Sequence, residues 1–128
     1  MGQVLVVDDD PELRSLLREA REAEGYEVFE ATEGSAALDL LRRSPQRFVV
    51  LLDYLMPRVG GKQVIQLVSQ DAGLSRRHAY ILMTARSRLS LPVEVVNTLA
   101  LSVVRKPFEL DDLFGTVAEA QKRLEASS

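Results

Sequence analysis

The stretch VLVVDDDP, residues 4–11, indicates how the fold begins, because four apolar residues are followed by three aspartates and a proline. An unbroken apolar run rich in β-branched residues is typical of a strand that is buried on both faces, as in a parallel sheet. Asp10 and Pro11 then offer an N-cap and a first-turn proline, so we predict that a helix begins there. Asp8 and Asp9 stand between the two elements, and neither element requires them.

The same succession of a short apolar run and a longer helical pattern repeats along the chain. Runs at 26–31, 48–52, 79–83 and 101–104 predict four further strands, each followed by a helical pattern. Such strict alternation is typical of an α/β fold with a parallel sheet and helices on both faces. We therefore predict one domain, residues 1–128, with five strand–helix pairs in a doubly wound, flavodoxin-like sheet of strand order 2-1-3-4-5.

Local sequence signals predict where the helices and loops lie. The first helix has an apolar face of Leu13, Leu16, Leu17 and Ala20. Gly25 is placed to end this helix in a left-handed conformation. Pro92 predicts a short helix before the last strand. We expect a polar loop at 75–78, in which the single histidine, His78, lies at the surface without a function.

Composition excludes several classes of protein. The chain has no cysteine, 46% hydrophobic and 27% charged residues, and a net charge of −3. A disulfide scaffold and a thiolate metal site are therefore excluded, and the cytoplasm is the expected compartment. No apolar run approaches the length of a membrane span. The acidic balance and the scattered arginines argue against direct binding of nucleic acid.

Polar residues follow most of the predicted strands at their carboxyl ends, where open α/β sheets bind their ligands. Asp8 and Asp9 follow the first strand, Asp53 the third, Thr84 the fourth and Lys106 the fifth. Clustered carboxylates repel one another unless a cation offsets the charge, and carboxylate oxygens are ligands that Mg²⁺ prefers. With that ion bound, Asp53 can attack phosphorus as a nucleophile, while Lys106 and Thr84 contact the phosphoryl oxygens.

These residues occur in a familiar order. Asp8-Asp9, the stretch LDYLMP at 52–57, Thr84-Ala85 and the stretch KPF at 106–108 together resemble response-regulator receiver domains over nearly the whole chain. The resemblance implies that Asp53 is the phosphoacceptor. It also implies a magnesium site in which Asp9, Asp53 and the Leu55 carbonyl are direct ligands, and Asp8 acts through water.

The resemblance further implies a signalling switch rather than an enzyme, with Asp53, Thr84 and Lys106 as its chemically active residues. The phosphoryl donor would be a sensor histidine kinase or a histidine phosphotransfer protein. The surface of the helix after Pro92, the last strand and the last helix would control an output domain, a protein target or a phosphorylation-dependent homodimer. One departure stands out, because receivers usually have an aromatic residue where this chain has Val103.

Two alternatives follow from the same residues. A hydrolase of the haloacid dehalogenase type would use Asp8 as its nucleophile, although this leaves Asp53 without a task and the chain is short for that class. A receiver-like interaction module would keep the fold without being switched by phosphate. The complete set of acids, Thr84 and Lys106 argues against the second alternative, and Val103 argues for an unusual output.

Overall fold

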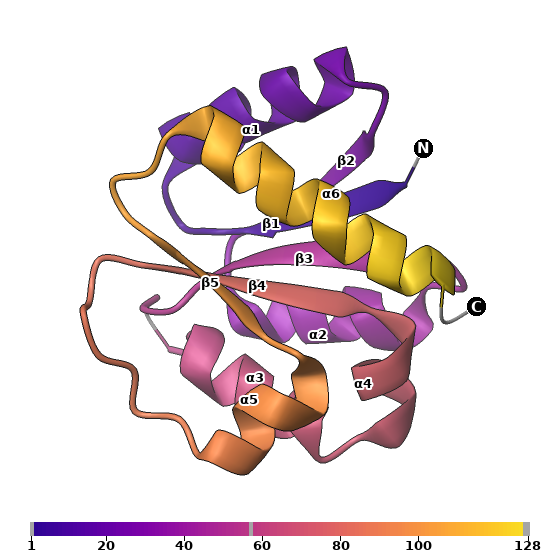
Figure 1. Cartoon of the computed structure of the whole chain (residues 1–128), viewed down its shortest axis with the longest axis vertical. Coiled ribbons are helices and arrows are strands. Elements are labelled where there is room, and N and C mark those ends of the chain that lie inside the picture. The colour runs from indigo at the N-terminus through magenta and orange to yellow at the C-terminus, as the bar shows by residue number, and fades with distance from the viewer. Residues whose placement is uncertain (1, 57, 127–128) are drawn as a thin grey trace.

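A computed structural model describes residues 2–56 and 58–126, so Pro57 of the LDYLMP stretch lies outside the described residues. Five parallel strands form one sheet in the order β2-β1-β3-β4-β5, which confirms the predicted fold class (Figure 1). The strands are β1 (Gln3–Val7), β2 (Glu27–Ala31), β3 (Phe48–Asp53), β4 (Ala79–Thr84) and β5 (Ser102–Arg105). Their bounds agree with the predicted strands to within one residue.

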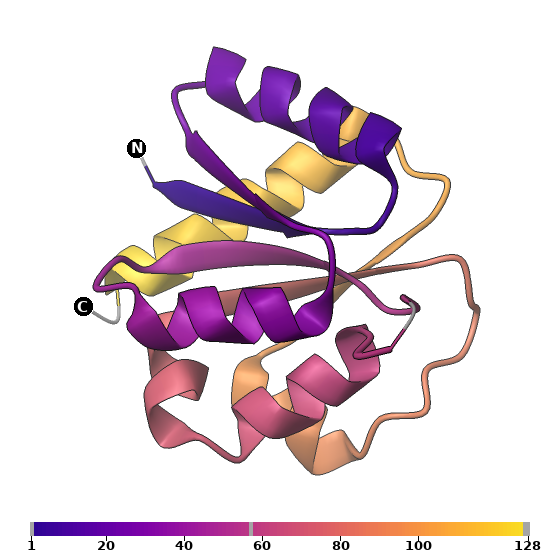
Figure 2. The same ribbon diagram turned by 180° about the vertical axis from the view of Figure 1, so that it is seen from behind.

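Helices cover both faces of the sheet (Figures 1 and 2). They are α1 (Pro11–Ala23), α2 (Gly34–Arg43), α3 (Gly61–Ser69), α4 (Ala72–Arg77), α5 (Val93–Leu99) and α6 (Leu110–Ala126). One face carries α1 and α6, and the other carries α2, α3, α4 and α5. No helix of the described residues is long and apolar enough to cross a membrane.

The signals read from the sequence set the bounds of the first helix. The Asp10 carboxylate caps α1 by accepting hydrogen bonds from the amides of Glu12 and Leu13. Gly25 follows the helix with a φ of 88°, the left-handed conformation that glycine adopts at least cost. The predicted N-cap and the predicted left-handed glycine are therefore confirmed.

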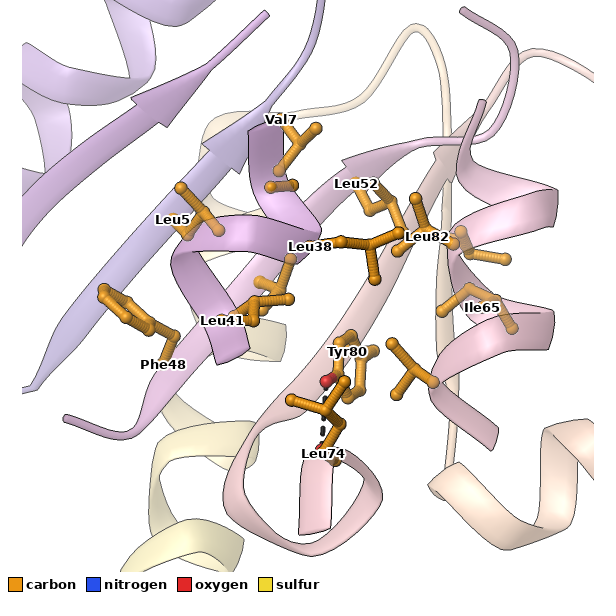
Figure 3. Close-up of a cluster of buried hydrophobic side chains, with 14 of the residues drawn as sticks. Leu5, Val7, Leu38, Leu41, Phe48, Leu52, Ile65, Leu74, Tyr80 and Leu82 are labelled. Carbon is orange, nitrogen blue, oxygen red and sulfur yellow. Dashed lines mark hydrogen bonds between the residues drawn. The ribbon is translucent and has the colours of Figure 1, made fainter. Parts of the chain in front are cut away.

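Two hydrophobic clusters fill the space between the sheet and its helices. In Figure 3, Leu38 and Leu41 of α2, Ile65 of α3 and Leu82 of β4 meet on one face of the sheet. Alternate residues of the same strands point to the opposite face, against Leu17 of α1 and the apolar side of α6. Because the central strands are buried on both faces, their carboxyl ends are held rigidly relative to one another.

Three local predictions were wrong. The expected polar loop at 75–78 is largely helical, because the Asp71 carboxylate caps α4 by accepting from the Leu74 amide. His78 is buried rather than exposed. On α1, Leu16 is 46% exposed, while Arg21 is only 1% exposed. The Arg21 guanidinium lies over the ring of Phe114 on α6, with 3.3 Å between its central carbon and the ring centroid.

Candidate functional site

Carboxylates from β1 and β3 gather at the carboxyl end of the sheet. Asp8 and Asp53 are buried and Asp9 is exposed, yet each offers an oxygen within 4.8 Å of the others. They meet because β1 and β3 are hydrogen-bonded neighbours, with Val7 paired to Leu52. The parallel sheet thus brings together the three acids that the sequence placed after two separate strands.

Lys106 lies between the two buried acids. Its Nζ is 3.0 Å from Asp8 Oδ2 and 3.5 Å from Asp53 Oδ1. The backbone holds it there, because its amide donates to the Thr84 carbonyl at 2.7 Å. Burial lowers the pKa of Lys106, but the hydrogen bond to Asp8 and the charges of both acids outweigh burial and raise it. The lysine therefore stays charged at this site.

One ammonium does not balance the acids. Burial and the negative charge of Asp8 raise the pKa of Asp53 to about 6, although Lys106 acts in the opposite direction. An excess of negative charge on closely spaced oxygen ligands is suited to a hard divalent cation such as Mg²⁺. The donor set therefore fits a magnesium ion.

The oxygens differ in how free they are to bind an ion. Asp8 Oδ1 accepts from the Asp10 amide at 2.9 Å, and Asp8 Oδ2 accepts from Lys106 at 3.0 Å. Both oxygens of Asp8 are therefore engaged. The exposed Asp9 carboxylate lies beside them and is open to solvent. This division agrees with direct ligation by Asp9 and Asp53 and a less direct role for Asp8.

Thr84 ends β4 beside these acids and is 2% exposed. Its Oγ1 accepts from the Arg86 amide at 3.0 Å, so the hydroxyl is now engaged with the loop that follows. Asp53 pairs with Met83, which places Thr84 next to the site in the adjacent strand. The structure therefore brings the four charged side chains together and places Thr84 at the end of the adjacent strand. The role of the Leu55 carbonyl stays a prediction.

Sequence reasoning missed two residues whose contacts hold the elements that border this site. Arg14 on α1 donates from its guanidinium to the Asp8 carbonyl at 2.9 Å, which ties the helix to the end of β1. Tyr54 follows Asp53 and is buried, with its hydroxyl accepting from the Ser90 amide at 3.1 Å. An aromatic residue directly after a buried strand was the available signal for Tyr54. Arg14 gave none, because the sequence does not show which way its side chain turns.

His78 lies at the opposite, amino end of the sheet. Its Nδ1 accepts from the Phe48 amide at 3.0 Å, so the proton is on Nε2, which lies 3.3 Å from the Leu41 carbonyl. Burial lowers the pKa of His78 to about 4, so the ring is neutral near pH 7. Both ring nitrogens are used within the fold, and His78 belongs to the core.

Comparison with known proteins identifies the family. The family of the response regulator receiver domain matches residues 4–118. The chain belongs to this family. It is therefore a receiver of the kind found in two-component response regulators, whose receivers act as signalling switches. Membership removes the support for a dehalogenase that uses Asp8.

Named relatives and solved structures agree with this assignment. Sporulation initiation phosphotransferase F of Bacillus subtilis is 32% identical, over 87% of this chain and 86% of that protein. Transcriptional regulatory protein CpxR of Escherichia coli is 41% identical over 67% of this chain, but the match covers only 34% of CpxR.

Among solved structures, a receiver domain protein of Methanospirillum hungatei has a TM-score of 0.85 at 25% identity, over 98% of both chains. TrrA of Thermotoga maritima, in complex with Mg²⁺ and BeF, has a TM-score of 0.78 at 31% identity, over 94% of this chain and 99% of that one.

Proposed function

We propose that residues 1–128 form one receiver domain that accepts a phosphoryl group on Asp53 in a magnesium-dependent reaction. The donor is a sensor histidine kinase or a histidine phosphotransfer protein. The observation that carries this proposal is the convergence of Asp8, Asp9 and Asp53 around one Lys106 ammonium. Family membership adds support, since receivers are the phosphorylated component of two-component systems.

In the proposed site, Asp9, Asp53 and the Leu55 carbonyl would hold Mg²⁺, and Asp8 would act through water. When bound, the ion neutralises the acids and the phosphoryl oxygens. It fits this site because the pKa of Asp53 is raised to about 6 by burial and by Asp8, so added positive charge favours the ionised form.

The ionised Asp53 oxygen then forms a bond to phosphorus while the bond from phosphorus to the donor nitrogen breaks. The donor imidazole leaves as a neutral ring after it takes up a proton. Lys106 already lies within 3.5 Å of Asp53, so it can turn from the carboxylate to a phosphoryl oxygen with little movement. The Thr84 hydroxyl would leave the Arg86 amide and donate to another of those oxygens.

The product is an acyl phosphate that alters the surface of α5, β5 and α6. Val103 of β5 is 44% exposed on this surface, where the family usually has an aromatic residue. An output domain, a protein target or a second copy of the chain would bind there. The expected setting is the cytoplasm, without direct contact to nucleic acid or membrane.

A phosphoryl-transfer assay tests the proposal. The protein is incubated with Mg²⁺ and acetyl phosphate, and the intact mass is measured. We expect one added phosphoryl group on the wild type, none on Asp53→Asn, and wild-type uptake by Asp10→Asn. The last variant is a matched control, because asparagine caps a helix as well as aspartate does and Asp10 caps α1 without belonging to the acid group.

Each other outcome has a distinct meaning. Uptake by Asp53→Asn would show that another acid, such as Asp8, is the nucleophile. No uptake by the wild type would identify an interaction module that is not switched by phosphate. Either result would overturn the proposed function.

A further inference from the structure

The loop between β4 and α5, residues 85–92, starts beside the proposed phosphorylation site and runs along the left of Figure 1. Two hydrogen bonds tie it to the body of the protein. The Arg86 amide donates to Thr84 Oγ1 at 3.0 Å, and the Ser90 amide donates to the Tyr54 hydroxyl at 3.1 Å. The first tether lies at the start of the loop and the second lies near α5.

Tyr54 connects this loop directly to the residue after Asp53. Its amide donates to the Met83 carbonyl at 2.9 Å, and its carbonyl accepts from the Gly61 amide at 3.1 Å. A side chain at Gly61 would collide with the Asp53 carbonyl, so the chain around Asp53 and Tyr54 is closely confined. The Tyr54 backbone is therefore fixed to β4 and to the start of α3 directly after Asp53.

The Tyr54 side chain extends that connection into the core. Tyr54 is 3% exposed and belongs to the hydrophobic cluster on the α2–α5 face of the sheet, against which Leu89 and Leu91 of the loop and Val95 of α5 also pack. The loop thus has apolar contacts to the same cluster on both sides of Ser90. Because the ring is confined, the hydroxyl is a fixed point for the Ser90 amide.

Val103 does not offer a comparable connection. It pairs with Leu82 across β4 and β5, and its side chain is 44% exposed. Two methyl groups have no polar atom with which to hold the loop. Within residues 2–56 and 58–126, Tyr54 is the aromatic side chain for which a hydrogen bond to the loop is observed.

We propose that the Tyr54 hydroxyl is the positioning contact that couples the state of Asp53 to the 85–92 loop and α5. This inference rests on the proposed function of Asp53. In the resting protein, Thr84 and Tyr54 hold the two ends of the loop. When Thr84 turns to the phosphoryl group, the Arg86 amide loses its acceptor, and the loop shifts about the point that Tyr54 still holds.

Amide hydrogen exchange of the full chain tests this coupling in Tyr54→Phe, which keeps the ring and removes the hydroxyl. In the unphosphorylated variant, we expect the Ser90 amide to exchange about tenfold faster than in the wild type, since one hydrogen bond is lost. In the wild type, phosphorylation by acetyl phosphate and Mg²⁺ should change exchange across residues 85–99. In the variant, this change should be at most about one third as large, while phosphoryl uptake by mass stays at the wild-type level.

Tyr80→Phe is the matched control. Tyr80 is also buried on this face of the sheet, but its hydroxyl donates to the Leu74 carbonyl at 3.0 Å, away from the loop (Figure 3). Like Tyr54→Phe, Tyr80→Phe loses one buried hydroxyl, but it should keep the full phosphorylation-dependent change in exchange across residues 85–99. Equal changes in Tyr54→Phe and the wild type would overturn the coupling, and so would a loss of the change in Tyr80→Phe.

A second variant, Ser90→Pro, removes the donor of the same bond and leaves Tyr54 in place, so it tests the contact if Tyr54→Phe does not fold. It should show the same reduced response at residues 93–99, and a full response would overturn the coupling. A wild type that takes up no phosphoryl group would overturn the proposed function and the coupling with it. Normal uptake, together with a phosphorylation-dependent change in exchange as large as the wild type's in both Tyr54→Phe and Ser90→Pro, would overturn the coupling alone.

Discussion

At the carboxyl end of the sheet, Asp8 and Asp53 are buried close to a single Lys106 ammonium, whereas at the amino end His78 is buried as a neutral ring. Both nitrogens of His78 have backbone partners at 3.0 and 3.3 Å. Asp53, by contrast, has a pKa raised to about 6, because burial and a like charge outweigh Lys106. The same sheet therefore contains a balanced polar site and an unbalanced one.

The difference teaches that burial of an ionisable side chain does not by itself indicate function. His78 needs no further group, since the fold already satisfies it, and its lowered pKa reflects burial. The acids at the other end still need positive charge, and a magnesium ion or a phosphoryl group with its ion can bring it. We therefore expect substitutions at the carboxyl end of the sheet to affect phosphoryl transfer, and substitutions at the amino end to affect stability.

The largest expected effect is on phosphoryl transfer in Lys106→Met. Methionine keeps much of the length of lysine and removes the charge that lies 3.5 Å from Asp53. Removal of one preorganised group that stabilises phosphoryl oxygens should slow uptake from acetyl phosphate by about 100-fold. The initial rate of phosphoryl uptake, followed by intact mass at saturating Mg²⁺, measures this effect.

Lys122→Met is the control for this measurement, because Lys122 is exposed on α6 and lies outside the site. Its rate should equal that of the wild type. A Lys106→Met rate within about threefold of the wild type would mean that the ammonium holds the resting acids but does not act on the phosphoryl group.

At the amino end, we expect an effect on stability that depends on pH. The pKa of His78 is lowered to about 4 from 6.5 by burial, so the unfolded chain binds a proton that the folded protein does not. The contribution of His78 is complete above pH 6.5 and is lost as the pH falls toward 4. The free energy of unfolding should fall by about 2 kcal/mol from pH 7 to pH 5 through this group.

The variant His78→Asn isolates that contribution, because its amide oxygen can still accept from the Phe48 amide but does not titrate. Urea unfolding of both proteins at pH 7 and pH 5 should show the extra loss only in the wild type. Asp53 has a raised pKa, so its contribution to the free energy of unfolding increases as the pH falls over this range. Because Asp53 is present in both proteins, its contribution cancels in the comparison. Equal losses would mean that His78 is accessible to protons in the folded protein.

The two ends also differ in how far the sequence predicts them. Asp8, Asp9 and Lys106 directly follow strands, so a correct assignment of the strands is enough to place them. His78 also adjoins a strand, but its ring is buried against Phe48 of β3 and the Leu41 carbonyl of α2, which are distant in the sequence. Arg21 is similar, because its burial comes from stacking on Phe114 of a distant helix. Contacts of this kind leave no local pattern in the sequence.

The smallest effect should come from Asp9, the exposed member of the acid group. Asp9→Asn keeps the shape of the side chain and removes one charge, so the fold should stay intact while Mg²⁺ binds about tenfold more weakly. Calorimetric titration at pH 7.5, where Asp53 is ionised, measures this, with Asp10→Asn as the variant of equal charge. If both variants weaken binding equally, the ion responds to net charge near the site. If only Asp9→Asn does, Asp9 is a ligand, and the unbalanced end of the sheet is a specific metal site.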